Sequence, residues 1–521
     1  MPAALPAGAI AGRGGLEVML QDKLGGSLDG VREYMQWYPY VCLEQNLSRA
    51  VALRDRSMWD AWMARLPVYM DGDGLLRYFP TDRLQGDDTL TAYVMAIADE
   101  AGWPLGESNQ QKLSTALKRF VAGKLRRDSA LATADLGIRK LAAINALSRY
   151  GDAKPGMLDS LRIEPNLWPT SALIDWAGIL KRVPKIDNAA AQRKTALGLL
   201  RARLNFQGTV MGFSTERSDG LWWLMVSGDS NANRMLLTVM NEADWEQDIP
   251  RLVRGSLFRQ HFGHWNTTVA NAWGVMAMEK FSAAFESTPV TGETVIDYGD
   301  QSRTQNWDDD ANEVQADAKD WTERNEVDLP TEGVQLPWQP GEQMLSITHQ
   351  GEGRPWAMVR ATAALPLEQP LFTGFSIKRS VTAVEQQQAG RWTRGDVVRI
   401  RLELDAQSDM SWVVVDDPVP AGSTILGGGL GGRGSLLAAD DSSEGWAWLA
   451  YEERRFDAYR AYYRFVPKGK WSVEYSVRLN NPGEFLLPAT RVEALYAPEM
   501  FGELPNPLFT VDASPTSAAA Q

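Results

Sequence analysis

The chain has 521 residues, of which 44% are hydrophobic and 23% are charged, so it can form more than one hydrophobic core and is not a disordered or collagen-like protein. The 66 acidic and 53 basic residues give a net charge of −13, which argues against binding to nucleic acid. One cysteine and three histidines exclude an intrachain disulfide, a zinc finger and an HExxH centre, so we expect no metal and no cofactor.

The sequence shows neither a membrane-spanning segment nor a targeting segment. No run of 18 apolar residues is present, and the first fifteen residues lack a charged region followed by an apolar stretch. Taken alone, these features indicate a cytosolic protein or part of a longer one.

Residues 1–27 contain one alternating segment, GGLEVMLQDKL, that predicts a strand. From 28 to 286 the apolar residues recur at three and four positions, which predicts a train of ten or more helices. The clearest helical segments are 47–66, 88–103, 110–125, 134–151, 170–183, 189–204, 234–244 and 266–285. Breakers such as Asp71-Gly72-Asp73-Gly74 and Gly102-Trp103-Pro104 separate them.

The period changes near residue 288. Residues 288–307 read as strands with glycine turns, and the acid-rich run 308–328 is typical of a solvated loop. From 341 to 512 alternating segments dominate, and their turn spacing predicts a β-sandwich. The glycine cluster at 427–434 lacks the GK[ST] ending of a phosphate loop and predicts a flexible hairpin; residues 513–521 predict a disordered tail.

The only cysteine lies in the stretch YPYVCLEQN. If Cys42 begins a helix, then Cys42 and Gln45 share a face within reach of each other, and the helix N-terminus favours the thiolate. Attack of the thiol on the Gln45 carboxamide, with loss of ammonia, would close an internal thioester that needs shielding from water. The alternative is a small buried hydrophobe, which is the commoner role of a lone cysteine before a helix.

The whole stretch YPYVCLEQNLSRAV resembles the thioester signature of the α2-macroglobulin and complement superfamily, in its bacterial form. The segments GLLRYFP, LTAYVMAIA and WNTTVANAWGVMAMEKFSAAF resemble further parts of the thioester domain. RPWAMVRATAALPL, KRSVTAVE, SDMSWVVVDDPVPAGSTILG and FLLPATRVEALYAPEMFGE resemble the terminal macroglobulin domain. These segments follow the family order over nearly the whole chain.

The resemblance implies a multidomain α plus β fold. Residues 28–286 would form an α/α toroid that carries the thioester. Residues 1–27 and 287–340 would be two parts of a CUB-like β-domain into which the toroid is inserted. Residues 341–512 would form the macroglobulin-type β-sandwich. Family members are about three times longer, so the resemblance also implies missing upstream macroglobulin domains, a missing bait region and an exported, periplasmic protein.

The resemblance implies a single-turnover endopeptidase inhibitor rather than an enzyme. Cys42 would supply the thioester sulfur and Gln45 the acyl carbon, with Leu43 and Glu44 inside the ring. A lysine amine of a target protease would attack the thioester and become covalently trapped. No histidine lies between Cys42 and His261, so we expect reaction with amines rather than transfer to hydroxyls.

Other residues carry weaker hypotheses. Tyr38 and Tyr40, together with Tyr496 and Met500 from the segment YAPEMF, could shield the thioester. His261 and His264 in HFGHW are expected to serve a turn or a helix cap rather than catalysis or metal binding.

Three other functions stay open. The first is a thioester-mediated adhesin that attaches to surface amines. The second is a toroid enzyme, such as a glycosidase or a cyclase, with Asp71 and Asp73 or Asp308–Asp310 as paired carboxylates. Against it, Asp71 and Asp73 alternate with glycines as a turn would, and 308–310 lie outside the helices. The third is a scaffold fragment in which no thioester forms.

Overall fold

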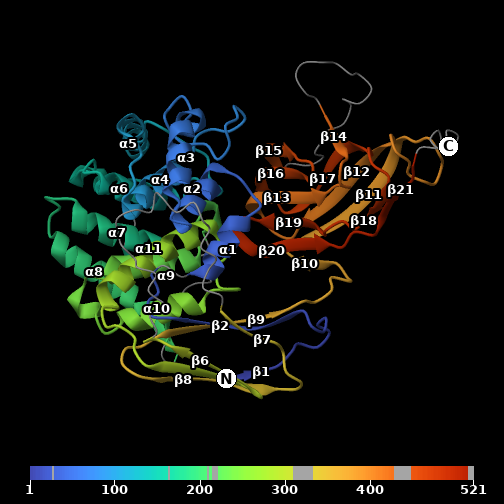
Figure 1. Cartoon of the computed structure of the whole chain (residues 1–521). Coiled ribbons are helices and arrows are strands. Elements are labelled where there is room, and N and C mark those ends of the chain that lie inside the picture. The colour runs from blue at the N-terminus through green and yellow to red at the C-terminus, as the bar shows by residue number, and fades with distance from the viewer. Residues whose placement is uncertain are drawn as a thin grey trace.

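The computed structural model describes residues 1–25, 28–161, 165–207, 210–213, 221–308, 333–427 and 447–513. It consists of a helical block, a small two-sheet β-domain that carries the N-terminus, and a β-sandwich beside the helical block (Figure 1). The mixed α plus β composition agrees with the sequence. Residues 309–328 of the predicted acid-rich run 308–328, most of the glycine cluster and the tail from 514 lie outside the described residues.

The helical block follows the predicted period. Its helices are α1 (Asp29–Trp37), α2 (Leu43–Ala52), α3 (Arg56–Tyr69), α4 (Asp88–Ala101), α5 (Glu107–Val121), α6 (Leu136–Arg149), α7 (Thr170–Arg182), α8 (Ala189–Ala202), α9 (Gly228–Val239), α10 (Ile249–Phe258) and α11 (Thr268–Phe285). The single helix expected at 47–66 is two helices. Arg54 has a φ of 56° and Asp55 caps α3 by accepting from the Met58 N–H, so the chain turns there.

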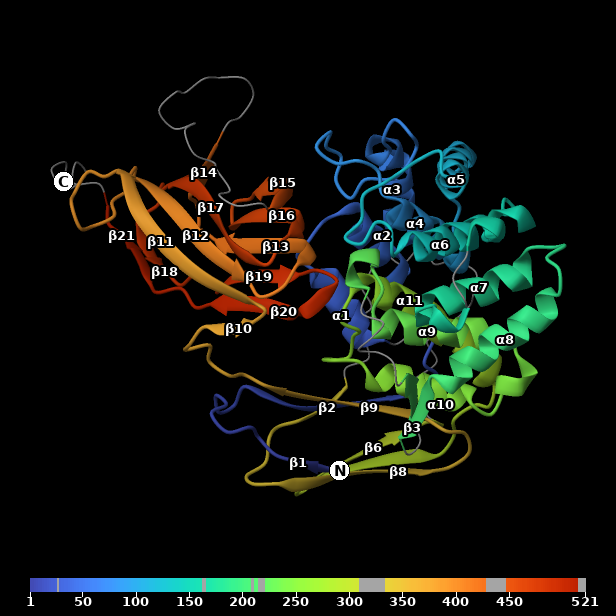
Figure 2. The same ribbon diagram turned by 180° about the vertical axis from the view of Figure 1, so that it is seen from behind.

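Among the described residues, six of these helices close a ring, since neighbours pack in the order α2, α4, α6, α7, α9, α11 and back to α2. The helices of this ring run the same way. Glu44 at the start of α2 contacts Thr268 at the start of α11, and Asp88 at the start of α4 pairs with Arg139 near the start of α6. Their N-termini therefore meet at one end of the block and their C-termini at the other (Figure 2).

A short hairpin, β3 (Leu204–Gln207) and β4 (Val210–Phe213), interrupts the helical block after α8. Neither this hairpin nor α10 stood out in the sequence. Gly255 in α10 lies directly against the backbone of Met211 in β4, and a Cβ there would come within 1.9 Å of the Met211 carbonyl oxygen. The glycine thus lets the hairpin pack against α10.

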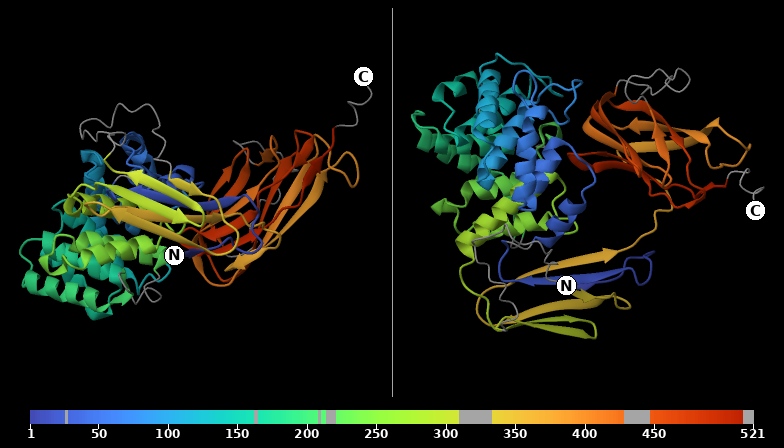
Figure 3. Two further views of the ribbon diagram at one scale, coloured as in Figure 1. Left: turned by 60° about the horizontal axis from the view of Figure 1, so that its bottom comes forward. Right: turned by 45° about the horizontal axis from the view of Figure 1, so that its top comes forward.

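The small β-domain combines strands from both sides of the helical block. One sheet has the order β1 (Pro2–Ala3), β8 (Gln343–Gln350), β5 (Glu293–Tyr298) and β6 (Gln301–Asn306). The other has the order β7 (Val334–Leu336), β2 (Gly14–Gln21) and β9 (Trp356–Ala363). Leu16, Val18 and Ile296 are among the apolar side chains packed between the sheets. The helical block is therefore an insertion within this β-domain, as Figure 3 shows.

The predicted boundary at 340/341 is too early. Strands β8 and β9 pair with β1, β5 and β2, so residues 343–363 belong to the small β-domain and not to the sandwich. Alternation predicts a strand but does not name its partner, which explains the error. The sandwich begins after β9.

The sandwich has two antiparallel sheets around a core of its own. The first has the order β10 (Leu371–Thr373), β20 (Ala497–Leu504), β19 (Thr490–Ala494), β13 (Met410–Pro418), β16 (Ala458–Val466) and β15 (Trp448–Arg454). The second has the order β11 (Phe375–Glu385), β12 (Val397–Ala406), β17 (Gly469–Arg478) and β14 (Thr424–Leu426). The strands β18 (Gly483–Phe485) and β21 (Phe509–Val511) pair separately. The first sheet faces the N-terminal end of the helix ring.

Candidate functional site

Cys42 caps the N-terminus of α2, as the spacing predicts. Its backbone is extended, with φ −86° and ψ 172°, and its Sγ accepts the Gln45 backbone N–H at 3.4 Å. In return, the Cys42 backbone N–H donates to Gln45 Oε1 at 2.9 Å. This reciprocal capping box brings thiol and carboxamide together in one turn, and the two residues are only 2% and 1% exposed.

The carboxamide of Gln45 is held at both ends. Its oxygen accepts the Cys42 N–H, and its Nε2 donates to the Tyr38 hydroxyl at 3.4 Å. A donor on the carbonyl oxygen draws charge from the acyl carbon and would stabilise an oxyanion formed there. The amide nitrogen, which leaves when a thioester closes, faces Tyr38.

The protonation of Cys42 differs from the expectation. Burial raises the pKa of the Cys42 thiol well above its usual range, and the nearby Glu44 raises that pKa further. Backbone N–H groups at the start of α2 lower the pKa, as a helix N-terminus should, but they do not outweigh burial. The thiolate is therefore not the resting form, and the prediction that the helix favours it is wrong in its net effect.

Glu44 is completely buried and accepts three hydroxyl hydrogen bonds. Ser48 in α2 and Thr268 in α11 donate to its Oε1 at 2.5 and 2.8 Å, and Tyr496 donates to Oε2 at 2.7 Å. Burial raises the pKa of the Glu44 carboxyl, and the three hydroxyl donors oppose that rise. The middle of the motif thus ties two helices of the ring to the sandwich.

Aromatic side chains from both domains cover this end of the ring. Tyr78 lies next to the motif, where its carbonyl accepts the Leu43 N–H at 2.8 Å. The Tyr78 ring packs against Trp412 of β13, with the ring centroids 4.0 Å apart. Tyr462 of β16 packs on Phe79 at 4.9 Å between ring centroids. These side chains are nearly inaccessible, so the sandwich closes the site from water.

Trp412 reaches the helical block because its backbone departs from the strand conformation. Its φ is 52°, in the left-handed region that a tryptophan rarely adopts. Its side chain belongs to the helical core, whereas its neighbour Val413 belongs to the sandwich core. Arg460 of β16 adds a polar tie by donating to the Pro39 carbonyl at 3.1 Å.

The structure brings three of the four predicted shielding residues to the motif. Tyr40 is buried beneath Arg460, Tyr496 binds Glu44, and Tyr38 is half-buried beside Gln45. Met500 is different. It packs against Gly374 and the sandwich core, so its predicted place over Cys42 is wrong. Trp37, which also precedes the motif, is 81% exposed and does not shield it.

The histidine pair forms a tight turn, as expected. The backbones of His261 and His264 exchange hydrogen bonds of 2.8 and 3.2 Å. The His264 ring stacks on Tyr34 with 3.7 Å between centroids, and Tyr34 contacts the edge of Tyr38. His264 thus supports an aromatic stack that ends at Gln45.

Asp71 and Asp73, the paired carboxylates of the toroid-enzyme hypothesis, lie in a turn and stabilise it. Asp71 accepts the N–H groups of Asp73 and Leu75, and Arg127 binds both carboxylates at 2.7 and 2.8 Å. Of the other candidate set, Asp308 accepts the Gly292 N–H, while Asp309 and Asp310 are outside the described residues. Within the described ranges, no group of three or more His, Cys, Asp or Glu is placed to hold a metal ion.

Sequence reasoning missed the partners of Glu44 and the role of Trp412. Thr268 and Tyr496 are 224 and 452 residues from Glu44 along the chain, and no local pattern joins them. The only available signal was the carboxylate itself, which lies between Cys42 and Gln45 in the motif. Among the described residues, none of the helices has the length and apolar character needed to cross a bilayer.

Comparisons with known proteins agree with this architecture. The family described as bacterial α2-macroglobulin MG10 domain matches residues 374–499. None of the curated protein sequences matches the chain. A crystal structure of native Escherichia coli α2-macroglobulin, from domain MG7 to the C-terminus, has a TM-score of 0.70 at 18% identity and covers 98% of this chain and 80% of its own.

Two longer structures match in the same way. The native Escherichia coli α2-macroglobulin seen by electron cryo-microscopy has a TM-score of 0.70 at 17% identity. Salmonella α2-macroglobulin reacted with methylamine has a TM-score of 0.69 at 17% identity. Both cover 98% of this chain, which spans 32% and 33% of their lengths. The chain therefore carries a bacterial α2-macroglobulin MG10 domain and has the fold of the C-terminal region of bacterial α2-macroglobulins.

Proposed function

We propose that the chain is the thioester-bearing part of an α2-macroglobulin-type endopeptidase inhibitor. In this proposal the helix ring is the α/α-toroid thioester domain, the small β-domain is the CUB-like domain, and the cell compartment is the periplasm. The observation that carries the proposal is the buried capping box in which Cys42 and Gln45 hold each other's reacting groups.

The thioester would form by acyl transfer within the box. Cys42 Sγ bonds to the Gln45 side-chain carbonyl carbon, the bond from that carbon to Nε2 breaks, and ammonia leaves with the thiol proton. The Cys42 N–H, already on Gln45 Oε1, would stabilise the oxyanion of the tetrahedral intermediate. The raised pKa of Cys42 means that the thiol loses its proton only as it attacks.

The trapping step would be a second acyl transfer. A lysine amine of a protease attacks the same carbon, the carbon–sulfur bond breaks, and Cys42 takes up the amine's proton as a free thiol. Each chain can do this once, so the protein is an inhibitor and not an enzyme. Access requires that the sandwich leave the N-terminal end of the ring, because Tyr496, Trp412 and Tyr462 close that end.

The test is covalent incorporation of a fluorescent primary amine. We expect the native chain to take up one amine at Gln45 and to release one titratable thiol. The Cys42→Ser variant keeps a capping side chain but cannot form a thioester, so it should take up none. Equal labelling of both proteins would contradict the proposal, because it would show that the amine enters elsewhere.

A further inference from the structure

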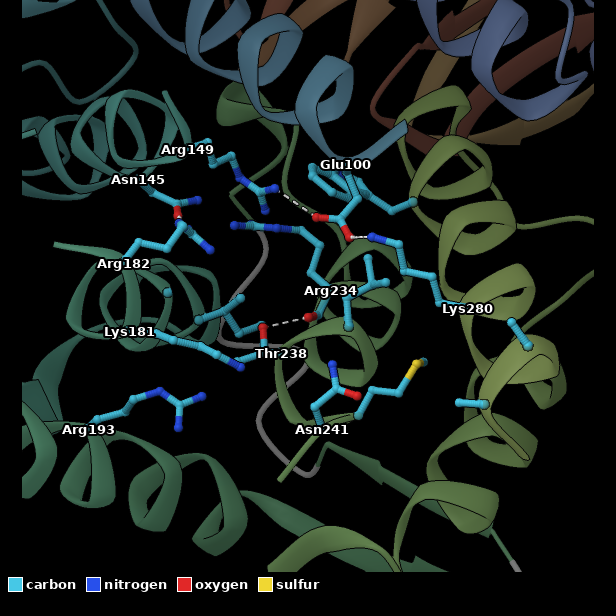
Figure 4. Close-up of a pocket in the computed structure, with 17 residues that line it drawn as sticks. Glu100, Asn145, Arg149, Lys181, Arg182, Arg193, Arg234, Thr238, Asn241 and Lys280 are labelled. Atoms are coloured by element: carbon cyan, nitrogen blue, oxygen red, sulfur yellow. Dashed lines mark hydrogen bonds and ion pairs between the residues drawn. The ribbon is translucent and has the colours of Figure 1, made fainter. Parts of the chain in front are cut away.

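A large cavity lies at the opposite end of the helix ring from Cys42. Its volume is about 690 Å³, within the range of roughly 300–1,000 Å³ that is usual for small-molecule sites. The last turns of α6, α7 and α11 line it, together with residues of α4, α8 and α9 (Figure 4). Apolar walls are provided by side chains such as Ile174, Leu237 and Met240.

The lining is strongly basic in an acidic protein. Of the described residues that line the cavity, six carry a cationic side chain and one, Glu100, carries a carboxylate. The cations are Arg149, Lys181, Arg182, Arg193, Arg234 and Lys280. Three further carboxylates, those of Asp99, Asp175 and Glu242, form ion pairs with these cations. Six cations thus meet four carboxylates, which leaves a surplus of two positive charges.

Arg182 is the cation without an ion pair among the described residues. Its Nε donates to Ser148 Oγ at 2.9 Å, and its Nη2 donates to Asn145 Oδ1. Burial and the neighbouring Arg149 lower the pKa of Arg182 to about 10. The carboxylates of Asp99, Asp175 and Glu100 oppose this fall, but none of them forms an ion pair with Arg182 among the described residues.

Gly178 makes room for that guanidinium. A Cβ on Gly178 would lie 2.7 Å from Arg182 Nη2 and 3.1 Å from Asn145 Oδ1. The glycine therefore allows the Arg182 side chain to fold across α7 toward the cavity instead of extending into water.

Helix dipoles do not account for the whole cluster. Helix C-termini attract cations, which explains Arg149 and Lys181 in the last turns of α6 and α7. Arg234, however, lies in the middle of α9, and Arg193 lies in the first half of α8. These two arginines are instead held beside the cavity by ion pairs, Arg234 with Asp175 and Arg193 with Glu242.

We propose that this cavity binds a small organic phosphate through its phosphomonoester dianion. Such a group carries nearly two negative charges at pH 7, which matches the surplus, and guanidinium forks suit its oxygens. The cavity exceeds what one phosphate fills, and the apolar walls would contact the organic part. The site is independent of the thioester.

The experiment is isothermal titration calorimetry of the whole chain with phenyl phosphate in an amine-free buffer, with benzoate as the monoanionic control. We expect a saturable one-to-one isotherm for phenyl phosphate and little heat from benzoate. Arg182→Gln should weaken binding by roughly tenfold, since hydrogen bonds to charged groups contribute that much. Lys181→Gln, at a half-exposed position, should weaken binding by a smaller factor.

Two controls separate a loss of the site from a general loss of charge or of folding. Arg83→Gln removes an exposed arginine outside the cavity and should leave the affinity unchanged. Amine uptake at Gln45 should be equal in Arg182→Gln and wild type, which verifies folding. Absence of saturable phenyl phosphate binding, equal affinity for benzoate, or full affinity in both cavity variants would each overturn the proposal.

Discussion

The two ends of the helix ring have opposite chemistry although the same helices build both. At the N-terminal end, aromatic rings and the sandwich cover Cys42, and the Glu44 carboxylate is held by hydroxyl groups. At the C-terminal end, a cavity of about 690 Å³ is lined with arginine and lysine. The N-terminal end can keep an acyl electrophile from water, whereas the C-terminal end keeps its ions partly solvated.

This difference follows from the parallel arrangement of the helices, which gives the two ends of the ring opposite partial charges. Helix N-termini offer N–H groups that stabilise an oxyanion or a capping carbonyl, and helix C-termini offer carbonyl groups that attract cations. What the ring does not provide is the cover, which comes from a separate domain.

The largest effect is expected from Trp412. Trp412→Ala removes a buried ring from between the domains, which costs about 3–5 kcal/mol for a core tryptophan. The sandwich should then separate more often, and the thioester proposed between Cys42 and Gln45 should react at least tenfold faster with methylamine. Trp448→Ala, at a 54% exposed position on the same sheet, is the control and should react as wild type does.

The backbone at Trp412 gives a finer test. Glycine adopts a φ of 52° without strain, whereas alanine pays about 1 kcal/mol for it. Trp412→Gly should therefore unfold at a higher urea concentration than Trp412→Ala, although both lack the ring. The reverse order would show that the left-handed conformation is not strained.

Removing the Glu44 carboxylate should have the next largest effect. Glu44→Ala leaves the hydroxyls of Ser48, Thr268 and Tyr496 without their acceptor, at a cost of about 3 kcal/mol in the free energy of unfolding. Glu44→Gln retains an acceptor and should cost about 1 kcal/mol. Urea unfolding measures both, and equal losses would mean that the hydroxyl network contributes little.

A smaller effect is expected at Tyr38. Tyr38→Gly removes the ring next to Gln45 and should shorten the lifetime of the thioester in water. The appearance of free thiol over time measures this lifetime. Tyr38→Phe loses only a 3.4 Å hydrogen bond and should behave nearly as wild type does. An unchanged lifetime in Tyr38→Gly would remove this residue from the shield.

The smallest effect is expected from pH. Burial lowers the pKa of His264 below its usual 6.5, so the folded state takes up its proton less readily than the unfolded state does. The free energy of unfolding should therefore fall as the pH drops below about 6.5. His264→Phe retains the stack on Tyr34 and should lose this dependence. Identical pH profiles of the variant and the wild type would show that His264 does not cause this pH dependence of the stability.

The sequence predicted most of the helices and the Cys42–Gln45 pair because these depend on neighbours in the chain. Asp87 and Thr267 cap α4 and α11 as local rules require. The partners of Glu44, the left-handed Trp412 and the strands joined by β8 and β9 depend on contacts far along the chain. The misplaced Met500 shows the same limit, since a strand pattern does not say which core a side chain enters.

We propose that Cys42 and Gln45 form a thioester behind the sandwich, and the intact mass of the chain measures this bond most directly. We expect a fresh protein about 17 Da lighter than its sequence mass, and a gain of about 31 Da at Gln45 after methylamine, with one new thiol. The full sequence mass, unchanged by methylamine and with Cys42 already titratable after unfolding, would contradict the claim. The buried capping box would then be a structural turn.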